Sequence, residues 1–181
     1  MELNLIAAVT KDWGIGANGG MLCSLPEDMA FFRTMTAGAI VIMGRATLEA
    51  LPDARPLKGR NNIVLSRNPE YTCAGACVVH SAAQALRAAA DIAVERIAAG
   101  ESMPQVYVIG GGQVYRQLLP YCTGAWITRM ELQMPAESFC PDLDAEPGWQ
   151  LTHTGESLVS TKEGVPFRIC RYTNTQPLAA L

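Results

Sequence analysis

The sequence lacks the long apolar runs and clustered charges that several classes of protein require. None of its apolar runs approaches the roughly 18 residues that span a membrane, so we expect no membrane partner. The opening residues, MELNLIAAVTKDW, carry neither a positively charged leader nor a small-residue cleavage site, which predicts a cytoplasmic protein. The net charge is −3 and Lys and Arg form no cluster, so we expect no nucleic acid partner either.

Cysteine and histidine are too few and too scattered to suggest a metal site. The six cysteines include no C-x-x-C pair, and there are only two histidines. Cys73, Cys77 and His80 come nearest to a set of metal ligands. Their spacing matches no common zinc pattern, and Val78 and Val79 between them are typical of a strand. We therefore predict reduced thiols and no metal.

What the chain does contain is a regular alternation of two kinds of apolar pattern. Its 181 residues are 49% hydrophobic and include no linker or repeat, so residues 1–181 are predicted to form a single domain. Strand-length apolar runs lie at 3–9, 39–43, 62–65, 105–109 and 125–130, and helical patterns follow the first four, at about 26–36, 45–51, 81–99 and 112–119. Ser81 with Gln84 forms a capping box at the start of the third helical pattern. The alternation of strands and helices predicts an α/β sheet with helices on both faces. Residues 150–160 and 167–173 alternate like antiparallel strands, which predicts a C-terminal hairpin at the sheet edge.

One carboxylate stands on the apolar face of the first predicted helix, in the stretch LCSLPEDMAFFRTMT. On a helix of about 100° per residue, four apolar residues fall within roughly 60° of Asp28: Leu25, Phe31, Phe32 and Met35. Ser24 and Glu27 form an S-x-x-E capping box with Ser24 as the N-cap, so Asp28 has no capping role. A buried lone carboxylate is costly unless it is paired. Asp28 is therefore either a functional group or a partly exposed residue of the first turn.

Three glycine-rich segments are candidate phosphate sites. GIGANG at 14–19 has the form G-x-G-x-x-G, but it does not connect a strand directly to a helix, so we interpret it as a mobile loop and not as a Rossmann motif. VYVIGGGQVY passes from strand to helix through residues 110–112, where free backbone N–H groups can bind an anion. VIMGRATLEAL brings Arg45 and Thr47 to a second helix start. Two such sites indicate a ligand with several phosphates.

Seven short segments occur in a fixed order: LIAAV, WGIGANGGM, SLPEDMAFF, VIMGRAT, RPLKGRNNIVLS, VIGGGQVY and ESFCPD. In this order, and over nearly the whole chain, they resemble dihydrofolate reductase. The resemblance implies a mixed, mainly parallel eight-stranded central sheet flanked by helices. It also implies reduction of 7,8-dihydrofolate to 5,6,7,8-tetrahydrofolate with NADPH as cofactor, through hydride transfer to C6 and protonation at N5. Antifolates would bind the same site, and we expect a monomer.

The resemblance further implies roles for individual residues in binding and reducing the substrate. Asp28 matches the acidic residue of the pterin pocket, where a carboxylate can accept both N3–H and the 2-amino group. Thr128 matches a hydroxyl that supports this acid, Met21 belongs to a loop that closes over the site, and Arg60 matches the residue that binds the glutamate α-carboxylate. The implied substrate-binding residues are Ile6, Ala8, Asp28, Met29, Phe32, Leu57, Arg60, Ile109 and Thr128.

A second set of positions matches the NADPH site. Its members are Ala8, Ile15, Gly44, Arg45, Ala46, Thr47, Leu65, Ser66, Arg67, Ile109, Gly110, Gly111, Gly112, Gln113, Val114 and Tyr115. We expect Arg45, Ser66 and Arg67 to bind the 2′-phosphate of NADPH. No acidic residue is expected where it could favour the ribose of NADH.

Some positions depart from the family pattern, and two other functions fit part of the sequence. Cys23 stands where tryptophan is common, which bears on proton delivery and antifolate affinity, and Glu137 stands where aspartate is usual. A same-fold reductase of the riboflavin pathway would share the glycine-rich turn but not the combination of Asp28 and Arg60. A non-catalytic nucleotide-binding module is favoured by Cys23 alone.

Overall fold

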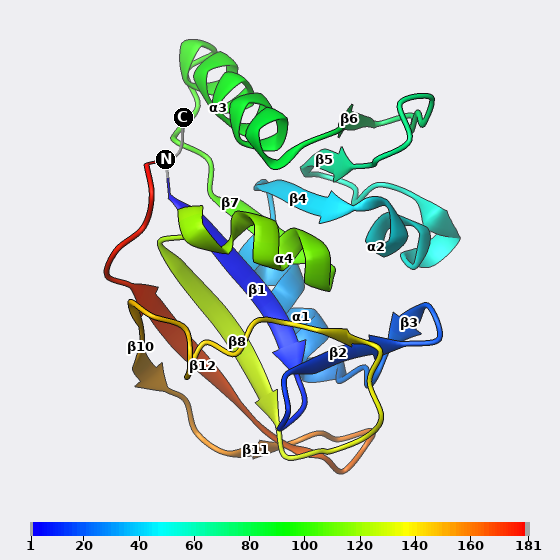
Figure 1. Cartoon of the computed structure of the whole chain (residues 1–181), viewed down its shortest axis with the longest axis vertical. Helices are drawn as coiled ribbons and strands as arrows, with labels where there is room; N and C mark the ends of the chain where they lie inside the picture. The colour runs from blue at the N-terminus through cyan, green and yellow to red at the C-terminus, as the bar shows by residue number, and fades with distance from the viewer. Residues whose placement is uncertain (1, 180–181) are drawn as a thin grey trace.

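The computed structural model describes residues 2–179 and is built around a mixed, mainly parallel sheet (Figure 1). From one edge to the other its strands are β10 (Trp149–Thr154), β12 (Pro166–Asn174), β8 (Gly124–Met130), β1 (Leu3–Val9), β7 (Val106–Gly110), β4 (Ile40–Gly44), β5 (Asn61–Leu65) and β6 (Ala76–Val79). The helices are α1 (Pro26–Thr36), α2 (Arg45–Glu49), α3 (Ala82–Ala98) and α4 (Gly112–Leu118), with short 3-10 turns at Pro52–Ala54 and Leu119–Tyr121. The predicted fold class is confirmed.

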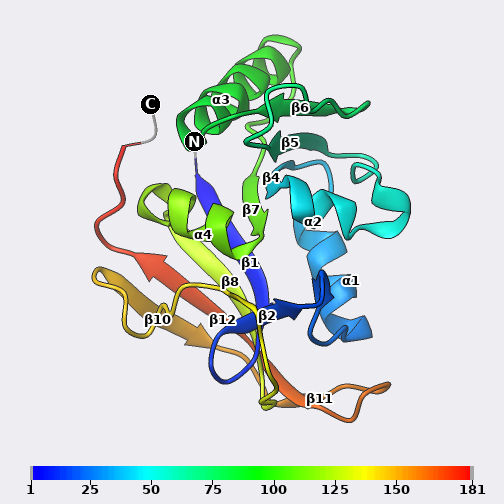
Figure 2. The ribbon, with the colours of Figure 1, turned by 45° about the vertical axis from the view of Figure 1, so that its right-hand side comes forward.

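Alternate residues of the central strands face two different layers of helices. On β4, Ile40 and Ile42 pack in the core that contains residues of α3 and α4, whereas Val41 and Met43 pack against Leu48 of α2. The α1 residues Phe31, Phe32 and Met35 cover this second face further along the sheet. Figure 2 shows α4 and α1 on either side of β1. Because both faces are covered, these strands are mainly apolar, as parallel strands usually are.

The C-terminal segment forms the predicted antiparallel edge. β12 pairs with β8 on one side, and on the other side it pairs with β10 and with the short strand β11 (Leu158–Val159). The hairpin therefore extends the sheet beyond β8. Among residues 2–179, no helix is long and apolar enough to cross a membrane.

The glycine-rich segment at 14–19 is a small hairpin, so the prediction of a loop is wrong for most of it. β2 (Gly14–Ala17) pairs with β3 (Gly20–Met21) and also with β9 (Ser138–Phe139), in a separate three-stranded sheet. The pairing with β9 joins residues about 120 positions apart in the sequence, which local patterns could not indicate. No helix follows β2, in agreement with the rejection of a Rossmann motif.

Of the two predicted capping boxes, one is confirmed and one is wrong. Ser81 caps α3 by accepting the backbone N–H of Gln84 at 3.2 Å. At α1 the N-cap is Leu25, without a side-chain cap, and Ser24 is exposed. Glu27 instead accepts both the backbone N–H of Thr161, at 2.8 Å, and its hydroxyl, at 2.7 Å. Glu27 thus ties α1 to the turn before β12.

The hydrogen bonds from Thr161, first through its backbone and then through its hydroxyl, lower the pKa of Glu27 to about 2. A carboxyl group whose pKa is lower in the folded state stabilises the protein above its unfolded pKa, and this gain disappears as the pH falls through the folded pKa. We therefore expect Glu27→Gln to lower the urea midpoint at pH 7. The difference from wild type should shrink as the pH falls from about 4.5 to about 2.

A matched control for this series is Glu156→Gln, which removes the same charge from an exposed position between β10 and β11. The urea midpoint of Glu156→Gln should stay close to that of wild type at every pH. A Glu27→Gln difference that is the same at pH 7 and at low pH would show that the ionised carboxylate does not stabilise the contact with Thr161.

Candidate active site

Two adjacent cavities lie where the parallel strands of the sheet end. The first, which we call the outer cavity, has a volume of about 680 Å³ and lies between the ends of β4, β5 and β7. The second, the inner cavity, has a volume of about 330 Å³ and lies between β1, α1 and the β2–β3 hairpin. Four residues line both: Ala46, Thr47, Gly111 and Ser138. A long ligand can therefore extend from one cavity into the other.

Asp28 is the carboxylate of the inner cavity and is 8% exposed. It lies in the first turn of α1, and the walls around it include Ile6, Met29 and Phe32. Burial raises the pKa of Asp28, and a hydrogen bond from Thr128 on β8 opposes this shift in part. The alternative that Asp28 is a partly exposed residue of the first turn is therefore wrong. Its carboxylate is available to a ligand in a mainly apolar pocket.

The floor and the rim of the inner cavity come from distant parts of the chain. The hydroxyl of Tyr115, on α4, donates to the carbonyl of Ile6 at 2.8 Å, and burial keeps its pKa well above the usual value, so it remains a donor. At the rim, the backbone N–H of Asn18 donates to Oε2 of Glu137 at 2.9 Å, and the N–H of Glu137 donates to the carbonyl of Gly16 at 2.9 Å. These bonds hold the β2–β3 hairpin, with Met21, beside the cavity.

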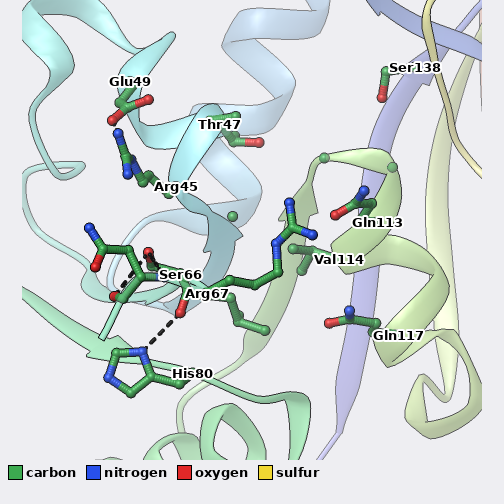
Figure 3. A pocket seen from close by; sticks show the side chains of 16 residues that line it. Arg45, Thr47, Glu49, Ser66, Arg67, His80, Gln113, Val114, Gln117 and Ser138 are labelled. Atoms are coloured by element: carbon green, nitrogen blue, oxygen red, sulfur yellow. Dashed lines mark hydrogen bonds and ion pairs between the residues drawn. The ribbon is translucent and has the colours of Figure 1, made fainter. Parts of the chain in front are cut away.

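The outer cavity carries the cationic and hydroxyl groups (Figure 3). Arg45 begins α2, and Ser66 and Arg67 directly follow β5. Figure 3 shows Arg67 extending across the cavity toward α4, while Arg45 is directed toward Glu49. His80, at the end of β6, bonds to the carbonyl of Ser66 through Nδ1 at 2.9 Å, and because a carbonyl only accepts, Nδ1 carries the hydrogen. These groups fit an anionic ligand.

Most of the residues predicted from the sequence lie in one of the two cavities. The predicted residues in the inner cavity are Ile6, Ala8, Ile15, Met21, Asp28, Met29, Phe32, Ala46, Thr47, Ile109, Gly110, Gly111 and Tyr115. Those in the outer cavity are Gly44, Arg45, Ala46, Thr47, Leu65, Ser66, Arg67, Gly111, Gly112, Gln113 and Val114. Three lie outside both linings: Leu57, Arg60 and Thr128.

Arg60 is placed at the opposite end of α1 from Asp28. Its guanidinium donates to the hydroxyl of Thr36 at 3.1 and 3.3 Å, and to the carbonyls of Arg33 and Lys58 at 3.2 and 2.7 Å. Since α1 rises about 1.5 Å per residue, Thr36 lies about 12 Å along the helix from Asp28. Leu57, beside Arg60, is fixed by Asn62, whose side chain bonds both its N–H and its carbonyl at 2.9 Å.

Sequence reasoning missed several residues of the outer cavity, above all Glu49 and His80. The sequence predicted no acidic residue placed to favour the ribose of NADH, and Glu49 lines the outer cavity beside Arg45. A signal was present, because Glu49 is four residues after Arg45 on a predicted helix, and this spacing places both side chains on one face. His80 was considered only as a metal ligand, and nothing in its local sequence connects it with Ser66 across the neighbouring strand.

Comparisons with known proteins show the family of the chain. A family model described as dihydrofolate reductase matches residues 2–174. The chain belongs to the dihydrofolate reductase family. A dihydrofolate reductase of Neisseria gonorrhoeae is 38% identical over 172 residues, covering 95% of this chain and 98% of the relative. One from Mycobacterium tuberculosis is 37% identical over 174 residues, covering 94% and 96%.

The fold is also that of the family. A solved dihydrofolate reductase from Enterococcus faecalis, complexed with NADP(H) and RAB-propyl, superposes with a TM-score of 0.76 at 29% identity, covering 95% of each chain. Among the described residues that line the inner cavity, Asp28 and Glu137 are the two carboxylates.

The raised pKa of Asp28 leads to a stability prediction for the protein without ligand. A carboxyl group whose pKa is higher in the folded state costs stability once the pH exceeds its unfolded pKa, and the full cost persists above the folded pKa. Asp28→Asn keeps the shape and removes the charge. We therefore expect a higher free energy of unfolding than wild type at pH 7, measured in urea, with the advantage disappearing below about pH 4.

The control is Asp91→Asn, which removes a carboxylate from an exposed position on α3. It should leave the free energy of unfolding close to wild type. If Asp28→Asn instead unfolds at lower urea at pH 7, then Asp28 is a structural anchor of α1 and its ionised form is well compensated.

Proposed function

We propose that this chain catalyses the NADPH-dependent reduction of 7,8-dihydrofolate to 5,6,7,8-tetrahydrofolate, with the pterin ring bound in the inner cavity against Asp28. The observation that carries the proposal is the buried carboxylate of Asp28, 8% exposed, in an apolar pocket that opens directly into a larger cationic cavity. The inner cavity suits a ring with a planar pair of N–H donors, and the outer cavity suits a phosphorylated dinucleotide.

Asp28 acts by orienting the substrate. Its two oxygens accept N3–H and the 2-amino group of the pterin, which fixes the plane of the ring. The negative charge at this edge of the ring favours protonation at N5. Thr128 supports the carboxylate by donating a hydrogen bond to it. The faces of the pterin ring lie against three apolar side chains, which exclude water: Met29 and Phe32 of α1 and Ile109 of β7.

The length of α1 suits the rest of the substrate. The 4-aminobenzoyl-glutamate tail would lie along the helix from Asp28 toward Arg60, where the guanidinium can bind the α-carboxylate of glutamate. Arg60 is already held by the last turn of α1, so little side-chain entropy is lost when it binds.

The cofactor is held by the ends of the parallel strands. When bound, NADPH supplies the hydride from its nicotinamide ring. Ala8, Ile15 and Tyr115 place that ring beside the substrate in the inner cavity, and the turn at Gly110 and Gly111 allows the chain to pass close to it. Holding two reacting carbons in register is the main contribution that a protein can make to such a transfer.

Three further properties belong to this proposal. The chain acts as a single domain and as a monomer. It works in the cytoplasm. Diaminopyrimidine antifolates bind in the inner cavity against Asp28, where their protonated ring pairs with the carboxylate. We propose no second function, since no feature of the site favours the riboflavin-pathway reductase or a non-catalytic module.

The direct test is the fall in absorbance at 340 nm when the protein is mixed with NADPH and 7,8-dihydrofolate. We expect turnover that a diaminopyrimidine antifolate inhibits. NADPH binding without oxidation would favour the non-catalytic module, and oxidation only with a riboflavin precursor would favour the other reductase.

The role of Asp28 predicts the outcome of its replacement. Asp28→Asn should lose on the order of 10²-fold or more in turnover at neutral pH, because an amide cannot provide the charge that favours protonation at N5. NADPH affinity, measured by fluorescence, should remain close to wild type, since Asp28 does not line the outer cavity. Retained turnover would remove Asp28 from the reaction.

The cationic side chains predict cofactor preference. Replacing Arg67 by Gln should raise the KM for NADPH about tenfold or more, because charge-assisted hydrogen bonds to the 2′-phosphate are lost. The KM for NADH should change much less. Arg45→Gln should act in the same direction, and Arg87→Gln, at an exposed position on α3, is the control. Equal effects on both cofactors would exclude Arg45 and Arg67 from phosphate binding.

A further inference from the structure

Arg45 already has partners in the cavity where the phosphate is proposed to bind. Its Nε donates to Oε1 of Glu49 at 2.6 Å, and its guanidinium carbon lies 4.8 Å from the centre of the Tyr71 ring. Figure 3 shows the guanidinium directed toward Glu49, while Arg67 extends the other way, toward α4. Both Arg45 and Glu49 line the outer cavity. A carboxylate therefore shares the space of a proposed phosphate-binding arginine.

The pair contributes little to the stability of the fold. The side chains of Arg45 and Glu49 are 45% and 47% exposed, and ion pairs as exposed as this one contribute little to stability. They are the first and last residues of α2, a helix of five residues that is also held by Leu48 in the core. The fold does not depend on the charge of Glu49, so its effect on a ligand can be measured separately.

NADPH and NADH would interact differently with the carboxylate of Glu49. A 2′-phosphate brought to Arg45, Ser66 and Arg67 places two like charges in one cavity, which costs free energy. A ribose 2′-hydroxyl carries no charge and can donate to a carboxylate, as it does in many NAD-dependent enzymes. Only Nε–H of Arg45 is bonded to Glu49, so the Nη groups can still bind the phosphate while the carboxylate remains nearby.

We propose that Glu49 is a specificity-determining residue for the cofactor, whose carboxylate weakens the binding of NADPH relative to NADH. The inference rests on the proposed function, in which the outer cavity holds the adenosine 2′-phosphate. Glu49 competes with the phosphate for the charge of Arg45 and repels it directly. The ratio of the Kd for NADH to the Kd for NADPH is therefore smaller than it would be if Arg45 and Arg67 acted without Glu49.

The test uses Glu49→Gln, which keeps an oxygen that can accept from Nε of Arg45 and removes only the charge. The Kd values for NADPH and NADH are measured by quenching of the intrinsic tryptophan fluorescence at pH 7 and low salt. We expect the Kd for NADPH to fall about threefold to tenfold and that for NADH to stay equal within about twofold, or to rise. The difference in the Kd for NADPH between Glu49→Gln and wild type should be smaller in roughly 0.5 M salt, where exposed charges are screened.

The matched control is Glu95→Gln, which removes the same charge from an exposed position of α3 outside both cavities. It should change neither Kd. A Kd for NADPH that is unchanged or higher in Glu49→Gln, or an equal gain for both cofactors, would overturn the proposal. If wild type oxidises NADPH with dihydrofolate and Glu49→Gln shows no gain, only the role of Glu49 is refuted. If wild type binds neither cofactor, the proposed function fails and the role of Glu49 fails with it.

Discussion

The hydrogen-bonded register of the parallel strands β1, β7, β4 and β5 is the constraint on which the rest of the structure depends. Ile40 lies opposite Val106 on one side and Asn61 on the other, so the strands reach their carboxyl ends together. Gly44 at the end of β4 therefore lies opposite Leu65 of β5 and close to Gly110 of β7, although the three are far apart in the sequence. A slip of one residue would turn each strand's side chains to the opposite face and would take Ile109 away from the inner cavity.

The same edge of the sheet supports two different electrostatic environments. At β1 and β8, α1 covers the sheet and leaves one carboxylate, that of Asp28, in apolar surroundings. At β4 and β5, the short helix α2 begins at the strand ends, and the cationic side chains of Arg45 and Arg67 line the outer cavity there. The difference follows from the lengths of the two helices: α1 has 11 residues and α2 has five. A polar cofactor and an apolar ring system thus find separate places within one continuous space.

Local patterns in the sequence predicted the features that depend on near neighbours, and failed where distant residues meet. The central strands, α3 with its Ser81 cap, and the apolar surroundings of Asp28 followed from periodicity and helix geometry. The β2–β3 hairpin did not, because it is completed by β9, and the cap at Ser24 was wrong because Glu27 bonds Thr161 instead. Family resemblance supplied the residues of both cavities, but Glu49 and His80 show that it does not identify the groups that modify a shared site.

The position of β12 has a consequence for how the protein is made. β12 pairs with β8, β10 and β11, all of which precede it in the chain, and its seven pairs with β8 run from Phe167 to Thr173. During synthesis, the edge of β8 that pairs with β12 therefore remains unpaired until residues 166–174 have left the ribosome. Thr128, whose hydroxyl bonds to the buried carboxyl group of Asp28, lies on β8 opposite Ile169. The strand that carries Thr128 is consequently paired on both sides only after residues 166–174 have been synthesised.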